Sequence, residues 1–370
     1  MIRINDKSQC SGCTACFAVC PKGAVSMKPD RLGFMYPEVD SDKCISCGLC
    51  IKVCPYGSEY SDYNSVEVYA AVNRNESVRA RSSSGGVFTE IASKVIENDG
   101  VVFGAAFSGT GNGTVEHVAV SDTDSLLILN GSKYVQSDMS DVFCKVRDLL
   151  DSGRTVLFTG TPCQVAGLNR FLGDRHDGLM SVACACHGVP SPEVWRRYYQ
   201  EVRGDSDHVS FRDKSDGWKN YMVRIGEYSC KAFSDPYMRA MIKGITLRPS
   251  CISCKFKGKD IGCDMILGDW WSIGRKAPEM DDDKGTSAVL VFSEQGRMHI
   301  EGEALTLKNM PQLDDAGNAG FNTKIFKPFN QDMLVDRMEG EDSIYRVLKS
   351  MTDATLYEKV ARRVKRIFKK

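Results

Sequence analysis

The sequence Gly160-Thr161-Pro162-Cys163-Gln164 decides the fold of the central part of the chain, because a buried strand ends there and a helix begins. An apolar, β-branched run over residues 155–159 predicts the strand, and residues 165–172 predict the helix. Cys163 therefore stands in the first turn of a helix, where free backbone N–H groups and the positive end of the helix dipole favour a thiolate. A thiolate at this position indicates a metal ligand or a nucleophile.

A second cysteine follows the next predicted strand. The apolar run 179–186 ends in Cys186, and Ser191-Pro192 then begins a helix that reaches about residue 202, since serine is a favoured N-cap and proline a favoured first residue. Alternating strands and helices predict an α/β domain with a mostly parallel or mixed sheet, in which ligands gather at the carboxyl ends of strands. Cys163 and Cys186 both lie at such ends.

Two further cysteines, Cys251 and Cys254, form a Cys-x2-Cys pair. Such a pair supplies two ligands to a metal and requires two more from elsewhere in the chain. Because Cys163 and Cys186 are available, the four cysteines could meet at one metal centre.

The first 60 residues contain an internal repeat of cysteines. Each cysteine of the first run recurs 34 positions later, and proline follows the last cysteine of each run: the runs are Cys10, Cys13, Cys16, Cys20 with Pro21, and Cys44, Cys47, Cys50, Cys54 with Pro55. This is the spacing of two-cluster ferredoxins, in which the last cysteine of each run binds the other cluster. We therefore predict one 4Fe–4S cluster on Cys10, Cys13, Cys16 and Cys54, and another on Cys44, Cys47, Cys50 and Cys20. A pair of zinc sites rarely requires this spacing twice.

The composition is that of an ordinary soluble protein, with 42% hydrophobic and 26% charged residues and a formal net charge of zero. No global basic field indicates a nucleic-acid partner. We find no secretory signal and no apolar run that could span a bilayer, and so expect a cytoplasmic protein. In such a reducing compartment, sixteen cysteines indicate metal binding more than disulfides.

A serine- and glycine-rich stretch, residues 81–86, precedes the helix predicted over residues 87–97. Small residues at the start of a helix allow backbone N–H groups to approach a phosphate, and Arg79 and Arg81 stand nearby. An ordinary capped helix explains the same residues equally well. The strand-like runs 101–107 and 114–120, with glycines between them, predict a hairpin.

Five motifs together resemble those of one family. They are Arg81-Ser-Ser-Ser-Gly-Gly86, Gly160-Thr-Pro-Cys-Gln164, Cys186-His-Gly-Val-Pro190, Cys251-x-x-Cys254-Lys-Phe-Lys257 and Gly268-Asp-Trp-Trp271. In this order they resemble the β subunits of coenzyme F420 hydrogenase and dehydrogenase, which are also related to 7-hydroxymethyl chlorophyll a reductase. The resemblance covers roughly residues 76 to 320, and an N-terminal two-cluster ferredoxin is a common companion.

The resemblance implies FAD in the α/β domain and a third 4Fe–4S cluster beside it, held by Cys163, Cys186, Cys251 and Cys254. The residues that it implies for FAD are Arg81, Ser84, Gly85, Gly86, Lys133, Tyr134, Val135, Gln136, Thr161 and Gln164. Cys263 is the reserve ligand, and Cys184 is expected to be a buried strand residue. Cys144 and Cys230 are expected to be core or incidental residues.

The predicted organisation has four parts. An α+β ferredoxin domain (residues 1–60) and a polar linker (61–75) precede the α/β flavin domain (76–320). A basic helical tail (321–370) follows, with seven basic residues in its last twelve. A helix docked on the body explains the tail better than contact with an acidic partner or a membrane surface.

Three other features have ordinary explanations. Cys163 and His187 could form a nucleophile pair, but the surrounding cysteines favour metal. Trp218, Trp270 and Trp271 are expected to serve packing more than flavin stacking. Residues 281–283, three aspartates, are expected to form a solvated loop.

The sequence therefore predicts an iron–sulfur flavoprotein oxidoreductase. It would exchange electrons with a redox protein and a hydride with a small carrier or substrate, for which the deazaflavin F420 is a candidate. The alternatives are a non-catalytic electron-transfer subunit of a larger hydrogenase, dehydrogenase or reductase complex, and a zinc-binding structural module fused to a ferredoxin.

Overall fold

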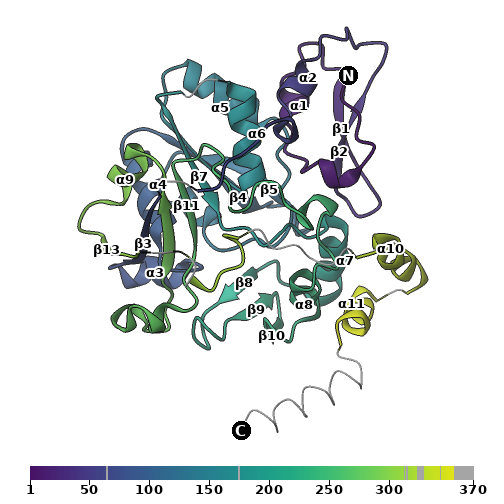
Figure 1. Ribbon diagram of the computed structural model, residues 1–370. Helices are drawn as coiled ribbons and strands as arrows, with labels where there is room; N and C mark the ends of the chain where they lie inside the picture. Colours follow the sequence, from purple (N-terminus) through teal and green to yellow (C-terminus); the bar gives the residue numbers. More distant parts are fainter. Residues whose placement is uncertain are drawn as a thin grey trace.

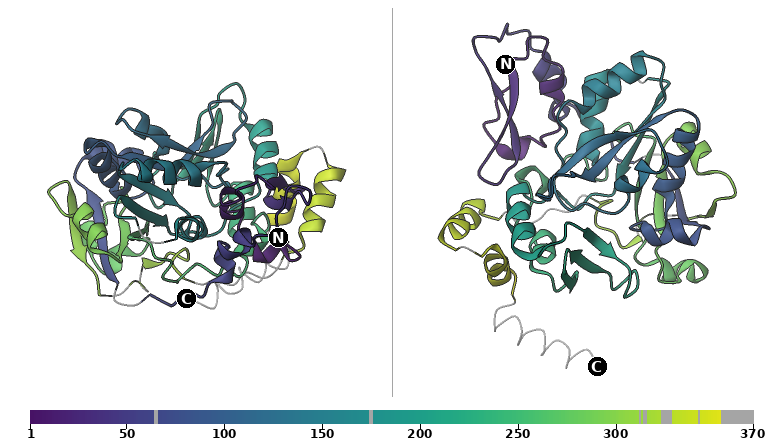
Figure 2. Two further views of the ribbon diagram at one scale, coloured as in Figure 1. Left: turned by 90° about the horizontal axis from the view of Figure 1, so that it is seen from above. Right: turned by 180° about the vertical axis from the view of Figure 1, so that it is seen from behind.

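The computed structural model describes residues 1–370 except 64–65, 174–175, 312, 314–315, 323–328, 342 and 354–370. An N-terminal module stands beside a larger α/β body (Figure 1). Two helices near the C-terminus, α10 (Gln331–Gly340) and α11 (Ile344–Thr352), lie against the same body, as Figure 2 also shows. No helix in the described part of the chain is long and apolar enough to cross a membrane. The basic end of the predicted tail, residues 354–370, lies outside the described residues.

The N-terminal module follows one backbone path twice. Its elements are η1 (Lys7–Gln9), α1 (Ala15–Ala18), β1 (Val25–Pro29), β2 (Met35–Val39), α2 (Leu49–Lys52) and η2 (Pro55–Gly57). Helix α1 follows Thr14, whose φ is 70°, and α2 follows Gly48, whose φ is 77°. Thr14 and Gly48 occupy equivalent positions of the sequence repeat, so the repeat is conformational as well. The antiparallel pair β1–β2 completes a ferredoxin-like α+β module, as predicted.

The body is built on a mixed sheet of eight strands, which confirms the predicted α/β class. In spatial order they are β13 (Leu305–Asn309), β3 (Glu67–Asn73), β12 (Ser287–Val291), β11 (Met265–Asp269), β7 (Leu179–Cys184), β6 (Val156–Gly160), β4 (Val101–Phe107) and β5 (Val115–Val120). The four strands from β11 to β4 are parallel, and the outer strands pair antiparallel. Strand β3 lies within residues 61–75, so part of the segment that we expected to be a linker belongs to the sheet. Its alternating pattern is short and interrupted by small residues, which hid it.

Helices cover both faces of this sheet. Helix α4 (Val87–Glu97) packs its buried residues against Val102, Leu157 and Met180, together with the end of α9 (Glu294–Ile300). Helices α5 (Val142–Asp151) and α6 (Pro162–Leu172) cover the opposite face and pack against Phe103 and Phe158. Successive residues of β4, such as Val102 and Phe103, thus pack on opposite faces of the sheet, as expected for a strand that is buried on both sides.

A smaller layer lies below the sheet in Figure 1. It contains the antiparallel strands β8 (Val209–Asp213), β9 (Met222–Ile225) and β10 (Tyr228–Lys231), and helices α7 (Pro192–Val202) and α8 (Pro236–Ile242). Trp195, Tyr198 and Tyr237 form its aromatic core. Leu32 and Phe34 of the N-terminal module are buried in the same core, so the module is packed onto the body.

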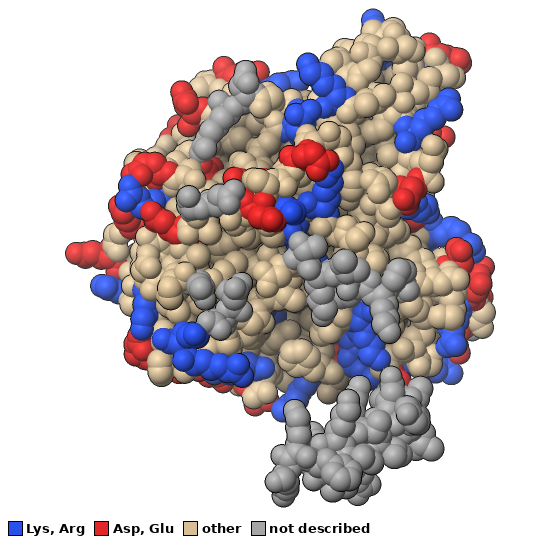
Figure 3. All heavy atoms as spheres, viewed as in Figure 1, with Lys and Arg blue, Asp and Glu red and all other residues tan. Residues whose placement is uncertain are grey.

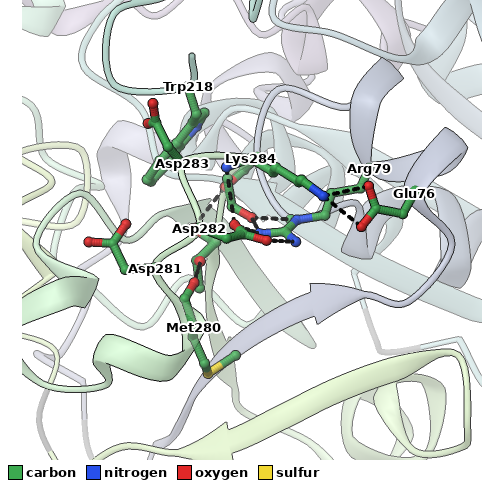
Figure 4. Close-up of polar contacts among 12 residues, drawn as sticks. Glu76, Arg79, Trp218, Met280, Asp281, Asp282, Asp283 and Lys284 are labelled. Carbon is green, nitrogen blue, oxygen red and sulfur yellow. Dashed lines mark hydrogen bonds and ion pairs between the residues drawn. The ribbon is translucent and has the colours of Figure 1, made fainter.

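The aspartate loop, residues 281–283, is only partly the solvated loop that we expected: Asp282 is exposed, but Asp281 and Asp282 both form ion pairs. Asp282 binds the buried guanidinium of Arg79 with two hydrogen bonds of 2.6 and 2.5 Å. Arg79 comes from α3 (Glu76–Arg81), beside which Lys284 pairs with Glu76 (Figure 4). Elsewhere on the surface, acidic and basic side chains are interspersed (Figure 3), as the zero net charge suggests.

His117 makes the stability of the sheet depend on pH. Its imidazole is buried on β5, and Nε2 lies 3.0 Å from the carbonyl oxygen of Thr159. Burial lowers the pKa of His117 to about 4, although the bond to Thr159 opposes this effect. In the unfolded chain a histidine titrates near ~6.5. The unfolded state therefore binds the proton between these values, and stability falls as the pH falls from 6.5 to 4.

We therefore expect acidification from pH 7 to pH 5 to cost the wild-type protein about 2 kcal/mol through this residue. His117→Gln, whose amide can still donate to Thr159, should lose less of its thermal midpoint between these pH values. His208→Gln is the control, because His208 is exposed. An equal pH dependence in all three proteins would contradict the assignment.

Candidate metal centres

The first centre is a small cavity lined by all four cysteines that the crossed pattern predicts. Cys10, Cys13, Cys16 and Cys54 surround it, with Thr14 and Tyr56. Burial raises the pKa of Cys13 to about 12, and the neighbouring thiols Cys10, Cys163 and Cys54 add to the effect. Burial and nearby thiols also raise the pKa of Cys16. If these thiols ionised together, a positively charged centre between them would offset their mutual repulsion.

The second centre is the complementary cavity, lined by Cys20, Cys44, Cys47 and Cys50. Burial raises the pKa of Cys20, but the backbone N–H groups of residues 22–25 outweigh burial and lower it below the usual value. One of these donors, the N–H of Ala24, lies 3.3 Å from Sγ. Backbone donors directed at a thiolate are the usual environment of an iron–sulfur ligand. Cys47 is exposed, so this centre lies near the surface.

The two cavities divide the eight cysteines as the sequence predicts. We expect Cys20→Ala to damage the cluster on Cys44, Cys47 and Cys50, because the thiol of Cys20 lines that cavity. Electron paramagnetic resonance of the reduced protein would show which cluster is lost. Cys230→Ala, far from both cavities on β10, is the control. Loss of the cluster on Cys10, Cys13 and Cys16 would contradict the crossed arrangement.

The third centre gathers cysteines from two strand ends and a knuckle. Cys163 lies in the first turn of α6, where Thr161 and Gln164 form a capping box and Thr161 Oγ1 lies 3.2 Å from Sγ. Burial raises the pKa of Cys163 to about 11, with Cys254 as the next cause. Burial likewise raises the pKa of Cys251 to about 12, followed by the effect of Cys254 and, more weakly, of Cys163.

Cys186 completes this group. Burial raises its pKa, and Cys184, Cys251 and Cys163 act in the same direction. The structure thus brings together Cys163, Cys186, Cys251 and Cys254, the four residues predicted for the third cluster. The N–H of Val189, which lies 3.4 Å from Cys251 Sγ, is a backbone donor of the kind that a cluster requires.

Two nearby cysteines differ in their surroundings. Cys263 is buried, and after burial itself the causes that raise its pKa are Asp264 and Asp260. Negatively charged carboxylates oppose ionisation of the Cys263 thiol, so Cys263 is an unfavourable thiolate ligand. Cys184 is exposed, not buried as we expected, and is the last residue of β7. It lies near Cys163 and Cys186.

The first and third centres adjoin. The hydroxyl of Ser11 lies near the thiol of Cys163 and lowers its pKa against the larger effect of burial. On α6, Gly167 packs so closely on Cys13 that a Cβ at residue 167 would lie 2.8 Å from its Sγ. Tyr56 lines the first centre. Burial raises its pKa, and Cys163, Cys254 and Cys251 of the third centre raise it further. The N-terminal module is thus docked with its first centre against the third.

Sequence reasoning missed two buried cations beside these centres. Arg248 is fully buried, and its Nε donates to the carbonyl of Cys10 over 2.7 Å. Lys257 is 2% exposed and donates over 2.6 Å to the carbonyl of His187, and it lowers the pKa of Cys186 and Cys251 against the larger effect of burial. Both stand within three residues of the Cys251–Cys254 pair, and this proximity in the sequence could have identified them as neighbours of a metal centre.

Among the residues predicted for FAD, several have structural contacts of their own. Gln164 is buried, its Oε1 accepts from the N–H of Thr161 over 2.8 Å, and its Nε2 donates to Ser137. Gln136 Nε2 donates to the carbonyl of Ser11 in the N-terminal module. Val135 is buried, and the hydroxyl of Tyr134 accepts from Arg212. These contacts explain why the residues are placed where they are, and leave their contact with flavin a prediction.

The serine–glycine stretch lies at the start of α4, next to the 133–136 segment. Ser132 donates to Ser83 Oγ over 2.9 Å, and Gly86, with φ 85°, precedes the first turn of the helix. Arg81 is exposed. Lys133 is hydrogen-bonded to the carbonyls of Ile128 and Asn130, and burial lowers its pKa to about 7. A helix start with small residues beside an arginine and a lysine fits a phosphate group.

The carbonyl groups of this stretch are anchored by a cluster of cations and tryptophans. Ser83 O accepts from Trp218 Nε1 and from Arg212, which is paired with Asp269 at 3.0 Å. Trp218 stacks on Trp271 with ring centroids 4.5 Å apart, and Trp270 is fully buried. Trp218 and Trp270 are therefore packed in the interior, as we expected, while Trp271 is half-buried.

In the described part of the chain, no group of three or more His, Cys, Asp or Glu side chains is arranged to hold a single metal ion. The donor sets of the three centres consist of thiols with backbone N–H groups around them. This chemistry fits iron–sulfur clusters.

Comparisons with known proteins agree with both parts of the prediction. Residues 9–58 match the family model of the 4Fe-4S dicluster domain, and residues 153–311 match that of the C-terminal part of the beta subunit of coenzyme F420 hydrogenase/dehydrogenase. The predicted family resemblance is thereby confirmed, while FAD and the relation to chlorophyll reductase stay predictions. A search of the curated proteins gives no match.

One solved structure is similar over much of its length. It belongs to a study of xenon derivatization of the F420-reducing NiFe hydrogenase complex from Methanosarcina barkeri. The likeness covers 79% of this chain and 92% of that chain, with 14% sequence identity and a TM-score of 0.47.

Proposed function

We propose that this iron–sulfur protein, related to the beta subunits of coenzyme F420 hydrogenase and dehydrogenase, passes electrons between a redox protein and a hydride carrier or substrate through three 4Fe–4S clusters and FAD. The observation that carries the proposal is the convergence of Cys163, Cys186, Cys251 and Cys254 directly beside the first ferredoxin centre. A ferredoxin module alone would need no such third group of thiols.

The positions of the centres define an order for electron transfer. The second centre is nearest to the surface, because Cys47 is exposed and Ile45 and Ile51 around it are 58% and 54% exposed. The first centre lies between it and the body, and the third lies at the strand ends of the body. We infer that single electrons enter or leave at the second centre and cross to the body between Cys13 and Cys163.

The residues of the chain have distinct parts in this scheme. Ser11 and Gly167 hold the first and third centres together, and Lys257 offsets negative charge at the third. The start of α4, with Ser84, Gly86 and Arg81, would hold a phosphate of FAD, and Lys133 to Gln136 with Thr161 would line its path toward Cys163. Bound FAD supplies the step that joins two single electrons to one hydride, which clusters alone cannot carry out.

An anaerobic titration would test the proposal. Purified protein should contain FAD and about twelve iron atoms, the number for three cubanes. Reduced F420, or another hydride donor, should bleach the flavin and then the clusters, and reduced ferredoxin should bleach them in the opposite order. Cluster reduction without flavin or hydride turnover would assign the chain as an electron-transfer subunit, and a colourless zinc protein would overturn both assignments.

A further inference from the structure

We propose that Arg248 is the counter-charge of the cluster at the first centre and sets its reduction potential from the body of the protein. Arg248 immediately precedes η4 (Pro249–Cys251), which carries a ligand of the third centre. Its guanidinium, however, extends to the first centre: Nη2 lies 3.7 Å from Cys10 Sγ, and Nε donates to the carbonyl of the same residue. One side chain thus joins the two centres between which the electron crosses.

The guanidinium is held rigidly. Nη1 donates to Gln136 Oε1 over 2.9 Å and Nη2 donates to Met35 O over 2.9 Å. The plane lies over the ring of Tyr36, 4.3 Å from its centroid, and the ring of Phe34 lies 5.4 Å away. Gly12 completes the enclosure, because a Cβ there would lie 2.9 Å from Nη1. Every one of these neighbours except Gln136 comes from the N-terminal module.

Unlike two other buried arginines, Arg248 forms no ion pair with a carboxylate in the described part of the chain. Arg79 and Arg212 each pair with an aspartate, at 2.5 and 3.0 Å. Among the described residues, no carboxylate lies within salt-bridge distance of Arg248. The neighbours above are carbonyls, an amide, rings and a thiol. Burying a cation without an anion is unfavourable, so negative charge near this guanidinium would stabilise it.

The first centre supplies that charge when a cluster is bound. A cubane with four thiolates is negatively charged, and one-electron reduction adds one more negative charge. A fixed cation beside Cys10 attracts the reduced state more strongly than the oxidised state, and burial strengthens this attraction. The reduction potential of the first cluster is therefore raised, while the second cluster, on the far side of the module, is affected less.

This inference rests on the proposed function only in requiring a cluster at the first centre. The test is a redox titration of the whole protein with dithionite, followed by electron paramagnetic resonance, with signals assigned by means of Cys20→Ala and Cys251→Ala. Arg248→Gln should weaken the electron affinity of the first cluster at least tenfold, about 59 mV for one electron. Arg248→Lys, which keeps the charge, should change it less than threefold. The titration needs neither flavin nor hydride turnover, so its failure is distinct from failure of the proposed function.

Arg170→Gln is the matched control. Arg170 also donates to the N-terminal module, at Lys52 O over 2.5 Å, but it is exposed, and its loss should leave all potentials unchanged. An unchanged first potential in Arg248→Gln would overturn the proposal. An equal fall of the first cluster's reduction potential in Arg248→Gln and Arg248→Lys would also overturn it, and so would loss of the first cluster from Arg248→Lys. Either result would assign Arg248 a purely structural role.

Discussion

Cys251→Ala is expected to remove about a third of the bound iron, four of about twelve atoms, while the two ferredoxin clusters stay intact. Cys251 is a buried thiol among the other three ligands of the third centre, and the cubane would lose one of four thiolates. Electrons from reduced ferredoxin should then stop at the first centre. Any flavin that is retained should still be reduced by a hydride donor, because that step does not use the clusters.

Iron content, resonance spectra and stopped-flow reduction of the flavin would measure these effects separately. Cys184→Ala and Cys263→Ala are the matched controls, since both thiols lie near the third centre but outside the proposed ligand set. An unchanged iron content in Cys251→Ala would refute the third cluster. Loss of iron in Cys263→Ala, with none in Cys186→Ala, would instead move the fourth ligand to Cys263.

The cysteine spacing allowed the metal centres to be predicted in detail. In a Cys-x2-Cys-x2-Cys run, one tight loop presents three thiols to the same cluster. The repeat of this run implies that the fourth cysteine of each run binds the other cluster. The structure places the eight cysteines around two cavities in that pairing. Cys163 and Cys186 could be placed together because both follow predicted strands, and parallel strands end at the same edge of a sheet.

The cations could not be predicted in the same way. Arg248 acts on a centre whose ligands come from another part of the chain, and the residues that enclose its guanidinium come mainly from the N-terminal module. Lys257 acts on Cys186 as well as on the nearby Cys251, and Cys186 comes from a different strand end. The aspartates at 281–283 were misjudged for the same reason, because their partners Arg79 and Lys219 are distant in sequence. Strand β3 was missed since its pairing with β12 and β13 is entirely long-range. Local patterns predict elements and ligand sets, whereas tertiary packing decides which charges meet.

The serine–glycine stretch shows the same limit, and Gly85 allows it to be tested. The family resemblance assigns Gly85 to FAD, yet its backbone is bound to the sheet: its carbonyl accepts from the N–H of Asn73 over 2.7 Å, and its N–H donates to Ser287 Oγ over 3.0 Å. A Cβ at residue 85 would lie 2.3 Å from Ala71 O and 2.8 Å from Ser287 N. Both are backbone atoms of central strands, which cannot move aside without disturbing the ladder.

We therefore expect Gly85→Ala to destabilise the protein by about 3 kcal/mol, at the upper end for overpacking. The thermal midpoint should fall by roughly 4 °C, and equally in flavin-free and flavin-loaded protein, because the clash does not involve the ligand. Gly109→Ala is the control, since Gly109 has no atom within 4 Å of its ideal Cβ position and needs no positive φ. If Gly85→Ala left the thermal midpoint of the flavin-free protein unchanged and weakened only FAD binding, we would conclude that residue 85 must be glycine to make room for the flavin. A fall in both forms would mean that this glycine serves the sheet, and that the flavin depends on it only through the position of α4.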